Sequence, residues 1–314
     1  MKITRREFLR YCGVTAGALG LSQLGLLRLN RALAAIDGIP VVWLQASGCT
    51  GCSVSFLNKI TNDDGPAADD LLLNHINLKY HPSVMAAAGD LAIASAKDAL
   101  AVGGYYLVVE GAIPTANHGA YCHVWEDILT GEPVTALDAI QDFSNNALGV
   151  IACGTCAAYG GIPSGNPNPT GCVGVRDIVD NGVINIPGCP PHPDWIIGTI
   201  AYILSEGRIP RLDSLGRPRM YFGNTVHSNC PNQQLDKAQQ LGDAGCLHNL
   251  GCKGQYTRAD CSLRKWNNGI SWCVGAQNPC QGCTEPDYPD GASPFYTLEM
   301  GRRRNRIRQL TGLK

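Results

Sequence analysis

Aromatic side chains, charge and long apolar segments are all scarce in this chain of 314 residues. Aromatic residues make up 7% of it and charged residues 16%. After residue 34, no apolar segment reaches the roughly 20 residues that a membrane-spanning helix needs, which argues against such a span there. Basic residues number 25 and acidic residues 26, and six of the basic ones precede residue 35. The rest of the chain is therefore acidic, which argues against nucleic-acid binding.

Cysteine, by contrast, is abundant. The chain has 15 cysteines and seven histidines, together with 37 glycines and 19 prolines. Such a composition suits a protein with many tight loops around metal sites better than a disordered chain. The length favours two domains and suffices for a sizeable core.

The first 34 residues have the features of an export signal. A twin-arginine pattern at residues 4–10 precedes an apolar run from Tyr11 to Leu29 and a small-residue cleavage site at residues 32–34. A permanent membrane anchor is the alternative, which the Gly, Ser and Thr content of the run disfavours. Because twin-arginine export carries folded proteins, the thiols are expected to bind metal before disulfides can form. The mature protein is then expected in the periplasm, soluble or peripheral.

Short apolar runs alternate with helical patterns from Ile39 to about Leu204. This alternation predicts an α/β domain with a doubly wound parallel sheet of the flavodoxin-like kind. The strands are expected at residues 39–45, 77–81, 105–110, 148–152 and 183–187, and helices at 54–60, 89–102, 134–143 and 194–204. We assign this domain to residues 35–207. Residues 208–314 are expected to form a small irregular domain that is rich in cysteine.

Three of the expected strands end in glycine and cysteine. Cys49 and Cys52 follow the first strand, Cys156 follows the fourth and Cys189 the fifth. In open α/β sheets the carboxyl ends of the strands share one edge, where ligands bind, so these four thiols can meet around one cluster. The Cys-x-x-Cys pair alone would equally suit iron-sulfur, zinc, a redox dithiol or a disulfide. Ordinary buried cysteines are the remaining alternative.

Glu110 ends the third strand at the same expected edge, within the sequence VEGAIP. A carboxylate there can accept hydrogen bonds from loop amides beside the cysteines. An ordinary solvated loop glutamate is the competing interpretation.

The region after Gly207 has seven cysteines and few apolar runs, so it cannot bury much core. Metal sites are therefore expected to hold it together. One candidate set combines a histidine with three cysteines, and the other is all cysteine. The sets are His227, Cys230, Cys246 and Cys252, and Cys261, Cys273, Cys280 and Cys283. Iron-sulfur clusters and zinc both suit these spacings, and a row of three clusters in one exported chain would conduct electrons.

Motifs along nearly the whole chain resemble the small, electron-transferring subunit of nickel-iron hydrogenases. They are the twin-arginine signal, GCTGCS, VEGAIP, GTCAAYGGIP, PGCPPHPDW, HSNC, CKGQYTRADC, WNNGISWC and PCQGCTEPD. The resemblance implies a proximal 4Fe-4S cluster on Cys49, Cys52, Cys156 and Cys189. It implies a distal 4Fe-4S cluster on His227, Cys230, Cys246 and Cys252. The medial cluster would be held by Cys261, Cys273, Cys280 and Cys283.

Two departures from the family pattern are informative. Many relatives have proline in place of Cys273 and hold a 3Fe-4S medial cluster, whereas four cysteines imply 4Fe-4S, as in the nickel-iron-selenium branch. If Cys273 does not ligate, the medial cluster is 3Fe-4S. Oxygen-tolerant relatives carry extra cysteines at the positions of Gly51 and Gly161, so no special oxygen tolerance is expected. Cys122, Cys153 and Cys172 match no ligand role.

The resemblance also implies partners. The nickel-iron centre would lie on a large subunit, since nothing in this chain resembles a nickel site, and a periplasmic cytochrome c is the expected electron acceptor. The basic segment at residues 302–308 is expected to be a solvated helix or tail. Three other classes compete with this interpretation. They are a free-standing ferredoxin-like carrier, a structural protein with zinc or disulfides, and the cluster subunit of respiratory complex I, which lacks the second domain and is not exported.

Overall fold

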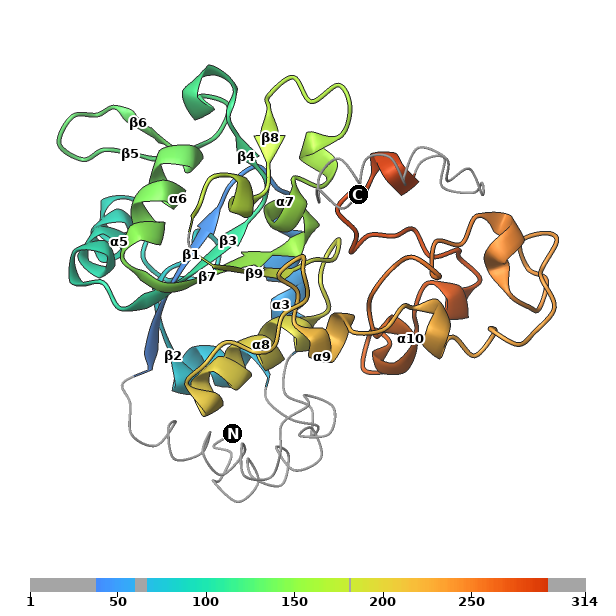
Figure 1. The fold of residues 1–314 in the computed structure, drawn as a ribbon. Coiled ribbons are helices and arrows are strands. Elements are labelled where there is room, and N and C mark those ends of the chain that lie inside the picture. Colours follow the sequence, from blue (N-terminus) through green and yellow to red (C-terminus); the bar gives the residue numbers. More distant parts are fainter. Residues whose placement is uncertain (1–37, 60–66, 181, 293–314) are drawn as a thin grey trace.

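A parallel sheet of five strands lies at the centre of the computed structural model (Figure 1). The structure describes residues 38–59, 67–180 and 182–292, so the expected export signal and the basic segment at residues 302–308 lie outside the described residues. The strand order is β2-β1-β3-β7-β9, and all neighbours are parallel. Counted along the chain these strands have the order 2-1-3-4-5, which is flavodoxin-like and confirms the predicted fold class. The strands are β1 Ile39–Gln45, β2 Ile76–Tyr80, β3 Tyr105–Glu110, β7 Ala147–Cys153 and β9 Val183–Ile186.

Helices cover both faces of the sheet, as the doubly wound pattern predicts (Figure 1). Successive strand residues point to opposite faces, so Trp43 packs with α3 and α8 while its neighbour Leu44 packs with α5 and α6. Both faces are apolar, which explains why the strands are nearly continuous hydrophobic runs. The helices are α3 Gly51–Leu57, α4 Ala68–Asp70, α5 Asp90–Val102, α6 Ala136–Asn145, α7 Gly154–Tyr159 and α8 Pro193–Glu206, with a π-helix at Leu71–His75.

The predicted helix over residues 134–143 begins too early. Residues 133–135 instead form β6 (Pro133–Thr135), which pairs with β5 (His123–Glu126) in an antiparallel hairpin. The Thr135 hydroxyl then accepts a hydrogen bond of 3.1 Å from the Asp138 N–H and caps α6. A second short pair, β4 (Ile113–Pro114) with β8 (Cys172–Val173), was also not predicted.

Regular structure is sparse in the chain that follows α8. Apart from two α-helices of four residues, α9 Arg219–Phe222 and α10 Cys261–Arg264, the described residues there form loops and single 3₁₀ turns. This part lies beside α3, α8 and the carboxyl ends of the sheet strands (Figure 1). Its irregularity agrees with the predicted small cysteine-rich domain. The 3₁₀ turns of the chain are Ala116–Gly119, Ile162–Ser164, Val175–Asp177, His227–Asn229, Leu247–Leu250, Val274–Ala276 and Asp290–Ala292.

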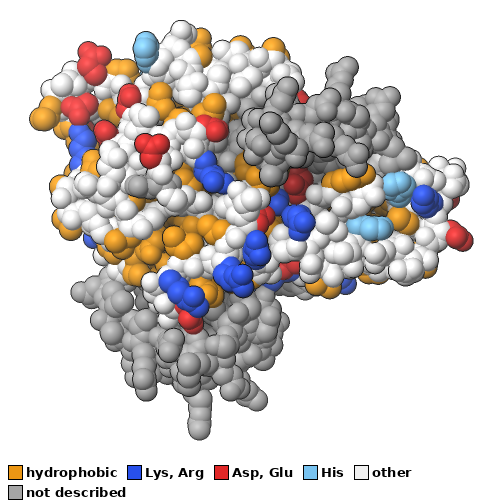
Figure 2. Space-filling model, viewed as in Figure 1, with side chains coloured by type: hydrophobic (Ala, Val, Ile, Leu, Met, Phe, Trp, Pro, Cys, Tyr) orange, Lys and Arg blue, Asp and Glu red, His pale blue; other side chains and the backbone are white. Residues whose placement is uncertain are grey.

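On the face shown in Figure 2, apolar side chains form a band at the lower left and smaller groups elsewhere, and basic side chains form a row across the middle. Within the described ranges, no helix combines the length and the apolar character that a bilayer crossing demands.

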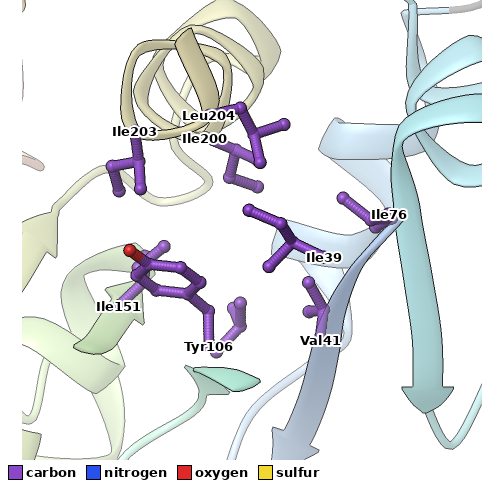
Figure 3. A pocket seen from close by; sticks show the side chains of 9 residues that line it. Ile39, Val41, Ile76, Tyr106, Ile151, Ile200, Ile203 and Leu204 are labelled. Atoms are coloured by element: carbon purple, nitrogen blue, oxygen red, sulfur yellow. The ribbon is translucent and has the colours of Figure 1, made fainter. Parts of the chain in front are cut away.

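An apolar pocket lies between α8 and the strands β1, β2, β3 and β7 (Figure 3). Eight aliphatic side chains and Tyr106 line it. It is at the opposite end of the sheet from the cysteine loops, because Ile39 and Ile76 begin their strands. We regard it as a packing defect of the core, with no part in the metal sites.

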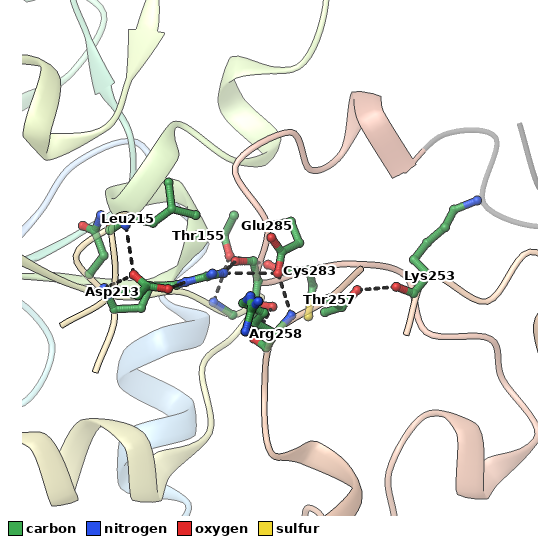
Figure 4. Close-up of polar contacts among 12 residues, drawn as sticks. Thr155, Asp213, Leu215, Lys253, Thr257, Arg258, Cys283 and Glu285 are labelled. Carbon is green, nitrogen blue, oxygen red and sulfur yellow. Dashed lines mark hydrogen bonds and ion pairs between the residues drawn. The ribbon is translucent and has the colours of Figure 1, made fainter. Parts of the chain in front are cut away.

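A buried ion network joins distant segments of the chain that follows α8 (Figure 4). The Arg217 guanidinium donates to Asp213 Oδ2 at 2.8 Å and to Glu285 Oε1 at 3.1 Å. Glu285 Oε1 also accepts the Arg258 N–H at 2.7 Å. The Arg217 side chain is only 3% exposed, so these charges depend on one another.

Replacing Arg217 with alanine should destabilise the fold by about 3–5 kcal/mol, because two carboxylates would remain buried without their cation. Anaerobic urea unfolding, followed by tryptophan fluorescence, would measure the loss. Arg208 is the matched control, since its side chain is 68% exposed and 4.0 Å from Glu206, and Arg208→Ala should cost less than about 1 kcal/mol. Equal effects of the two substitutions would contradict this account.

Candidate metal centres

Four predicted thiols meet at the carboxyl edge of the sheet. Cys49 lies in the loop between β1 and α3, and Cys52 lies in the first turn of α3. Cys156 lies in α7 directly after β7, and Cys189 follows β9. Thr50, between the first two, takes a left-handed φ of 63°, which β-branched residues rarely adopt, so this turn is tight.

The four side chains lie close enough to interact electrostatically in all six pairings. Burial, with smaller contributions from the charges of Cys189, Cys52 and Cys49, raises the pKa of Cys156 to about 12. Burial and the same neighbours raise the pKa of Cys189. Crowded thiols that resist ionisation are stabilised as thiolates when a metal group binds them, so this donor set fits an iron-sulfur cluster. We call these four residues the first group.

Glycines leave room beside the first group. A Cβ at Gly154 would collide with the Cys52 sulfur, and Gly154 has φ of +92°, where side chains are rarely tolerated. A Cβ at Gly51 would lie 3.0 Å from the Cys49 sulfur, and one at Gly161 would lie 3.0 Å from the Cys156 sulfur. Gly51 and Gly161 are the positions where the resemblance expects extra cysteines in oxygen-tolerant relatives. The structure places both beside the predicted cluster ligands.

Glu110 anchors the Cys49–Cys52 loop, as one of the two interpretations of the sequence predicted. Its Oε1 accepts the N–H groups of Cys52 at 2.9 Å and Ser53 at 3.2 Å. Its Oε2 accepts from the Trp43 indole and the Gln45 amide, each at 3.1 Å, and from the Ser53 hydroxyl. The residue is 2% exposed, so the alternative of a solvated loop glutamate is wrong.

His81 extends this network and was missed in the sequence. Its Nδ1 accepts the Ser83 N–H at 3.1 Å, which leaves Nε2 to donate to the Ser53 hydroxyl at 3.2 Å. Burial lowers the pKa of His81 to about 4, against the opposing charge of Glu110, so the ring is neutral at pH 7. Its position directly after β2, at the edge that carries the cysteines, was the available signal.

The free energy of unfolding should decrease as pH falls, because His81 is buried as the neutral ring. Because the pKa of His81 is lowered in the fold, the unfolded chain takes up this proton first. The stabilisation is complete above the ordinary pKa of about 6.5 and is lost as pH falls towards about 4, at about 1.4 kcal/mol per unit. His81→Gln keeps an N–H donor and should flatten this slope in urea unfolding between pH 7 and pH 5. The exposed His118→Gln should keep the slope, and equal slopes for all three proteins would refute the assignment.

Three of the four residues in the predicted histidine-containing set also come together. The thiols of Cys230, Cys246 and Cys252 interact in all three pairings, and burial is the main reason that the pKa values of Cys230 and Cys252 are raised. The His227 backbone lies beside these thiols. The His227 N–H donates to the Gly254 carbonyl at 2.9 Å, and the His227 carbonyl accepts the Cys230 N–H at 3.0 Å. We call these four residues the last group.

The members of the all-cysteine set also come together. Five of the six thiol pairings among Cys261, Cys273, Cys280 and Cys283 interact electrostatically. Burial raises the pKa of Cys283 to about 12 and is also the main cause of the raised pKa of Cys261. Cys273 belongs to this set by position, because its charge raises the pKa of both Cys261 and Cys283. We call these four residues the middle group.

The middle group touches both of the others. A hydrogen bond to the backbone of Cys189, in the first group, lowers the pKa of Cys283 against the larger effect of burial. The Cys280 N–H donates to the Cys252 sulfur of the last group at 3.4 Å. The three groups therefore form a row whose order in space is first, middle, last.

The remaining described cysteines lie outside the groups. Cys153 is fully buried behind Cys52, and a hydrogen bond between the two thiols, followed by burial, raises the pKa of Cys52. Cys172 is buried in β8, and Cys122 lies within electrostatic reach of it. In the described part of the chain, no three His, Cys, Asp or Glu side chains converge on the position of a single metal ion.

Comparison with known proteins gives consistent matches for both parts of the chain. Residues 49–203 match the family described as the 20 Kd subunit of NADH ubiquinone oxidoreductase, and residues 222–296 match the C-terminal domain of the NiFe/NiFeSe hydrogenase small subunit. The periplasmic [NiFeSe] hydrogenase small subunit of Desulfomicrobium baculatum is 43% identical over 95% of this chain and 100% of that protein. The periplasmic [NiFe] hydrogenase small subunit 1 of Nitratidesulfovibrio vulgaris is 39% identical over 94% and 93%.

Solved structures give the same result. The H2-activated [NiFeSe] hydrogenase of Desulfomicrobium baculatum has a chain that is 44% identical and superposes with a TM-score of 0.79, covering 84% of this chain and 100% of that one. An actinobacterial-type NiFe hydrogenase from Ralstonia eutropha has a chain with 29% identity and a TM-score of 0.78, covering 88% and 91%.

Proposed function

This chain belongs to the family of NiFe and NiFeSe hydrogenase small subunits, and from that membership we propose that it relays electrons between a hydrogen-activating large subunit and an external acceptor. The observation that carries the proposal is the row of three cysteine groups. Iron-sulfur clusters, when bound, supply one-electron transfer. The protein's own contribution is to hold neighbouring groups in hydrogen-bonding contact, Cys283 with the backbone of Cys189 and the Cys280 N–H with the Cys252 sulfur.

Each group has a proposed cluster. The first group would hold the proximal 4Fe-4S cluster and the last group the distal one, with His227 as a neutral ligand. The middle group would hold a 4Fe-4S cluster if Cys273 ligates. The exposed positions of Cys49 and Cys189 suit a partner surface over the first group, where we place the large subunit.

Location and acceptor remain proposals as well. The small subunits of Desulfomicrobium baculatum and Nitratidesulfovibrio vulgaris are described as periplasmic, and the twin-arginine pattern of residues 4–10 supports folded export of this chain. A periplasmic cytochrome c is the proposed acceptor. The boundary after residue 34 is proposed on the export-signal pattern, and the division between residues 35–207 and 208–314 on the change from regular to irregular structure after α8.

Replacing Cys273 with proline should remove one iron from the middle group, because three thiolates would remain for the cluster. The expected product has about one iron less per molecule and a new paramagnetic resonance signal of a 3Fe-4S cluster in the oxidised state. Cys172→Ala is the matched control, since Cys172 is a buried cysteine outside the groups. An unchanged iron content in Cys273→Pro would exclude Cys273 as a ligand.

The function itself is tested by purifying the chain from its native host under anaerobic conditions through an affinity tag. We expect a brown complex with a second, nickel-containing chain that reduces a viologen dye when hydrogen is supplied. A brown protein without the second chain would favour the ferredoxin-like carrier. A colourless zinc protein would refute the relay altogether.

A further inference from the structure

Thr155 lies between the first group and the middle group. It directly precedes Cys156 in α7, and it is only 1% exposed. The Thr155 N–H donates to the Gly188 carbonyl at 2.9 Å, and the Gly188 N–H donates back to the Thr155 hydroxyl at 2.8 Å. Gly188 in turn directly precedes Cys189. Thr155 therefore ties together the two segments that carry Cys156 and Cys189.

The same hydroxyl also reaches the middle group. It donates to the backbone carbonyl of Cys283, a predicted ligand of that group (Figure 4). A hydroxyl has one proton and two lone pairs, so it can accept the Gly188 N–H and donate to the Cys283 carbonyl at the same time. The Thr155 side chain thus forms a bridge of two hydrogen bonds between the segment of Cys189 and the segment of Cys283.

The junction between the middle group and the last group is built from other atoms. There the Cys280 N–H donates to the Cys252 sulfur at 3.4 Å, and the Cys280 carbonyl accepts the Lys253 N–H at 2.8 Å. Both donors are backbone groups, which every residue except proline has. The bridge at the first junction instead needs a side-chain hydroxyl, which threonine and serine provide and valine does not.

Burial makes the bridge difficult to replace. Without the hydroxyl, the Gly188 N–H and the Cys283 carbonyl would each lose a partner inside the protein, and a buried polar group that is left unpaired is costly. The two segments would then shift until water or another group could satisfy them. The separation of the first and middle groups would no longer be fixed.

We propose that Thr155 is a positioning residue of the relay, and that its hydroxyl fixes the first group against the middle group for electron transfer. In this step one electron leaves the first cluster and enters the middle one, while no proton moves and no bond breaks. The rate of such a step depends steeply on the separation of the two clusters and on the bonded path between them. A buried hydrogen-bonding residue that joins the two ligand segments can therefore control it. This inference rests on the proposed electron-relay function and assigns one more residue to it.

The test is the magnetic interaction between the first and middle clusters in the purified heterodimer. When both are reduced, each is paramagnetic, and their interaction splits the electron paramagnetic resonance spectrum by an amount that falls as the clusters separate. Thr155→Val removes the hydroxyl and keeps the branched shape, so the splitting should decrease. Thr155→Ser keeps the hydroxyl and should keep the splitting.

Thr199→Val is the matched control. Thr199 is also buried, but its hydroxyl donates within α8, to the Trp195 carbonyl at 2.6 Å. This variant also loses a buried hydroxyl and should keep the wild-type splitting.

Hydrogen-dependent reduction of a viologen dye gives a second readout. It should fall by about 10-fold in Thr155→Val, the scale on which loss of a hydrogen-bonding residue behind a ligand acts. Exchange of hydrogen isotopes on the large subunit should stay at the wild-type rate. Thr155→Ser and Thr199→Val should remain near wild type in both assays.

An unchanged splitting or wild-type dye reduction in Thr155→Val with full iron content would overturn the proposal. If Thr155→Val does not take up full iron, Thr155→Ala, which leaves room for a water, is measured in its place. Loss of iron from both, with full iron in Thr155→Ser, would assign the hydroxyl to cluster assembly and overturn the proposal as well. Wild-type protein without iron would instead refute the proposed function, so the two failures are distinct.

Discussion

Protein prepared without iron will keep its five-stranded sheet and lose its structure after about Arg219. The described chain beyond that point has two α-helices of four residues, and eight of the twelve predicted ligands lie there. Structural metal sites contribute on the order of 10 kcal/mol to small domains, more than a chain of this kind can gain from its own core. Limited proteolysis with mass spectrometry should find cleavage sites between residues 223 and 292 only in the iron-free protein.

Rebuilding the clusters with iron and sulfide should restore the protection, which serves as the control for irreversible damage. The sheet domain is an internal reference, because both of its faces have apolar cores that need no metal. Full protection of residues 223–292 in the iron-free protein would contradict the view that clusters hold this region.

Replacing Cys230 with alanine should lower hydrogen-dependent reduction of cytochrome c by more than about 100-fold. Loss of a ligand should have a larger effect than the roughly 10–100-fold loss that follows removal of a residue that hydrogen-bonds to a ligand. Cys230 belongs to the last group, from which electrons would leave the protein. Hydrogen activation on the large subunit should persist, and exchange of hydrogen isotopes would show it. The two assays therefore separate electron transfer from hydrogen chemistry.

Cys172→Ala should leave both assays near wild type, since Cys172 belongs to none of the three groups. Cytochrome reduction at the wild-type rate in Cys230→Ala would mean that electrons leave from another place. Loss of isotope exchange together with cytochrome reduction would mean that the substitution disturbs the complex as a whole.

The fold was largely predictable from sequence because its strands are buried on both faces. β1 and β3 occupy the predicted residues, β2 and β7 differ from prediction by one residue at each end, and β9 ends one residue earlier than predicted. The hairpin of β5 and β6 was missed, since the three residues of β6 look like the first turn of α6. A strand this short takes its conformation from its partner, which local sequence does not reveal.

The candidate sites were predictable to a similar degree. Cysteines that follow parallel strands must lie at one edge of the sheet, so the four members of the first group could be predicted from the sequence. The cysteine-rich region has no such frame, and its two sets came from spacing and from family resemblance. His81 was missed although it directly follows β2, because a single histidine shows its burial and its partners only in the folded chain.

The most direct test of the relay is the iron and nickel content of the heterodimer, purified anaerobically from its native host. Three 4Fe-4S clusters and the iron of the partner's nickel-iron centre predict about thirteen irons and one nickel per heterodimer. About twelve irons with nickel would keep the relay and remove Cys273 from it. Zinc in place of iron, with no nickel, would contradict the account.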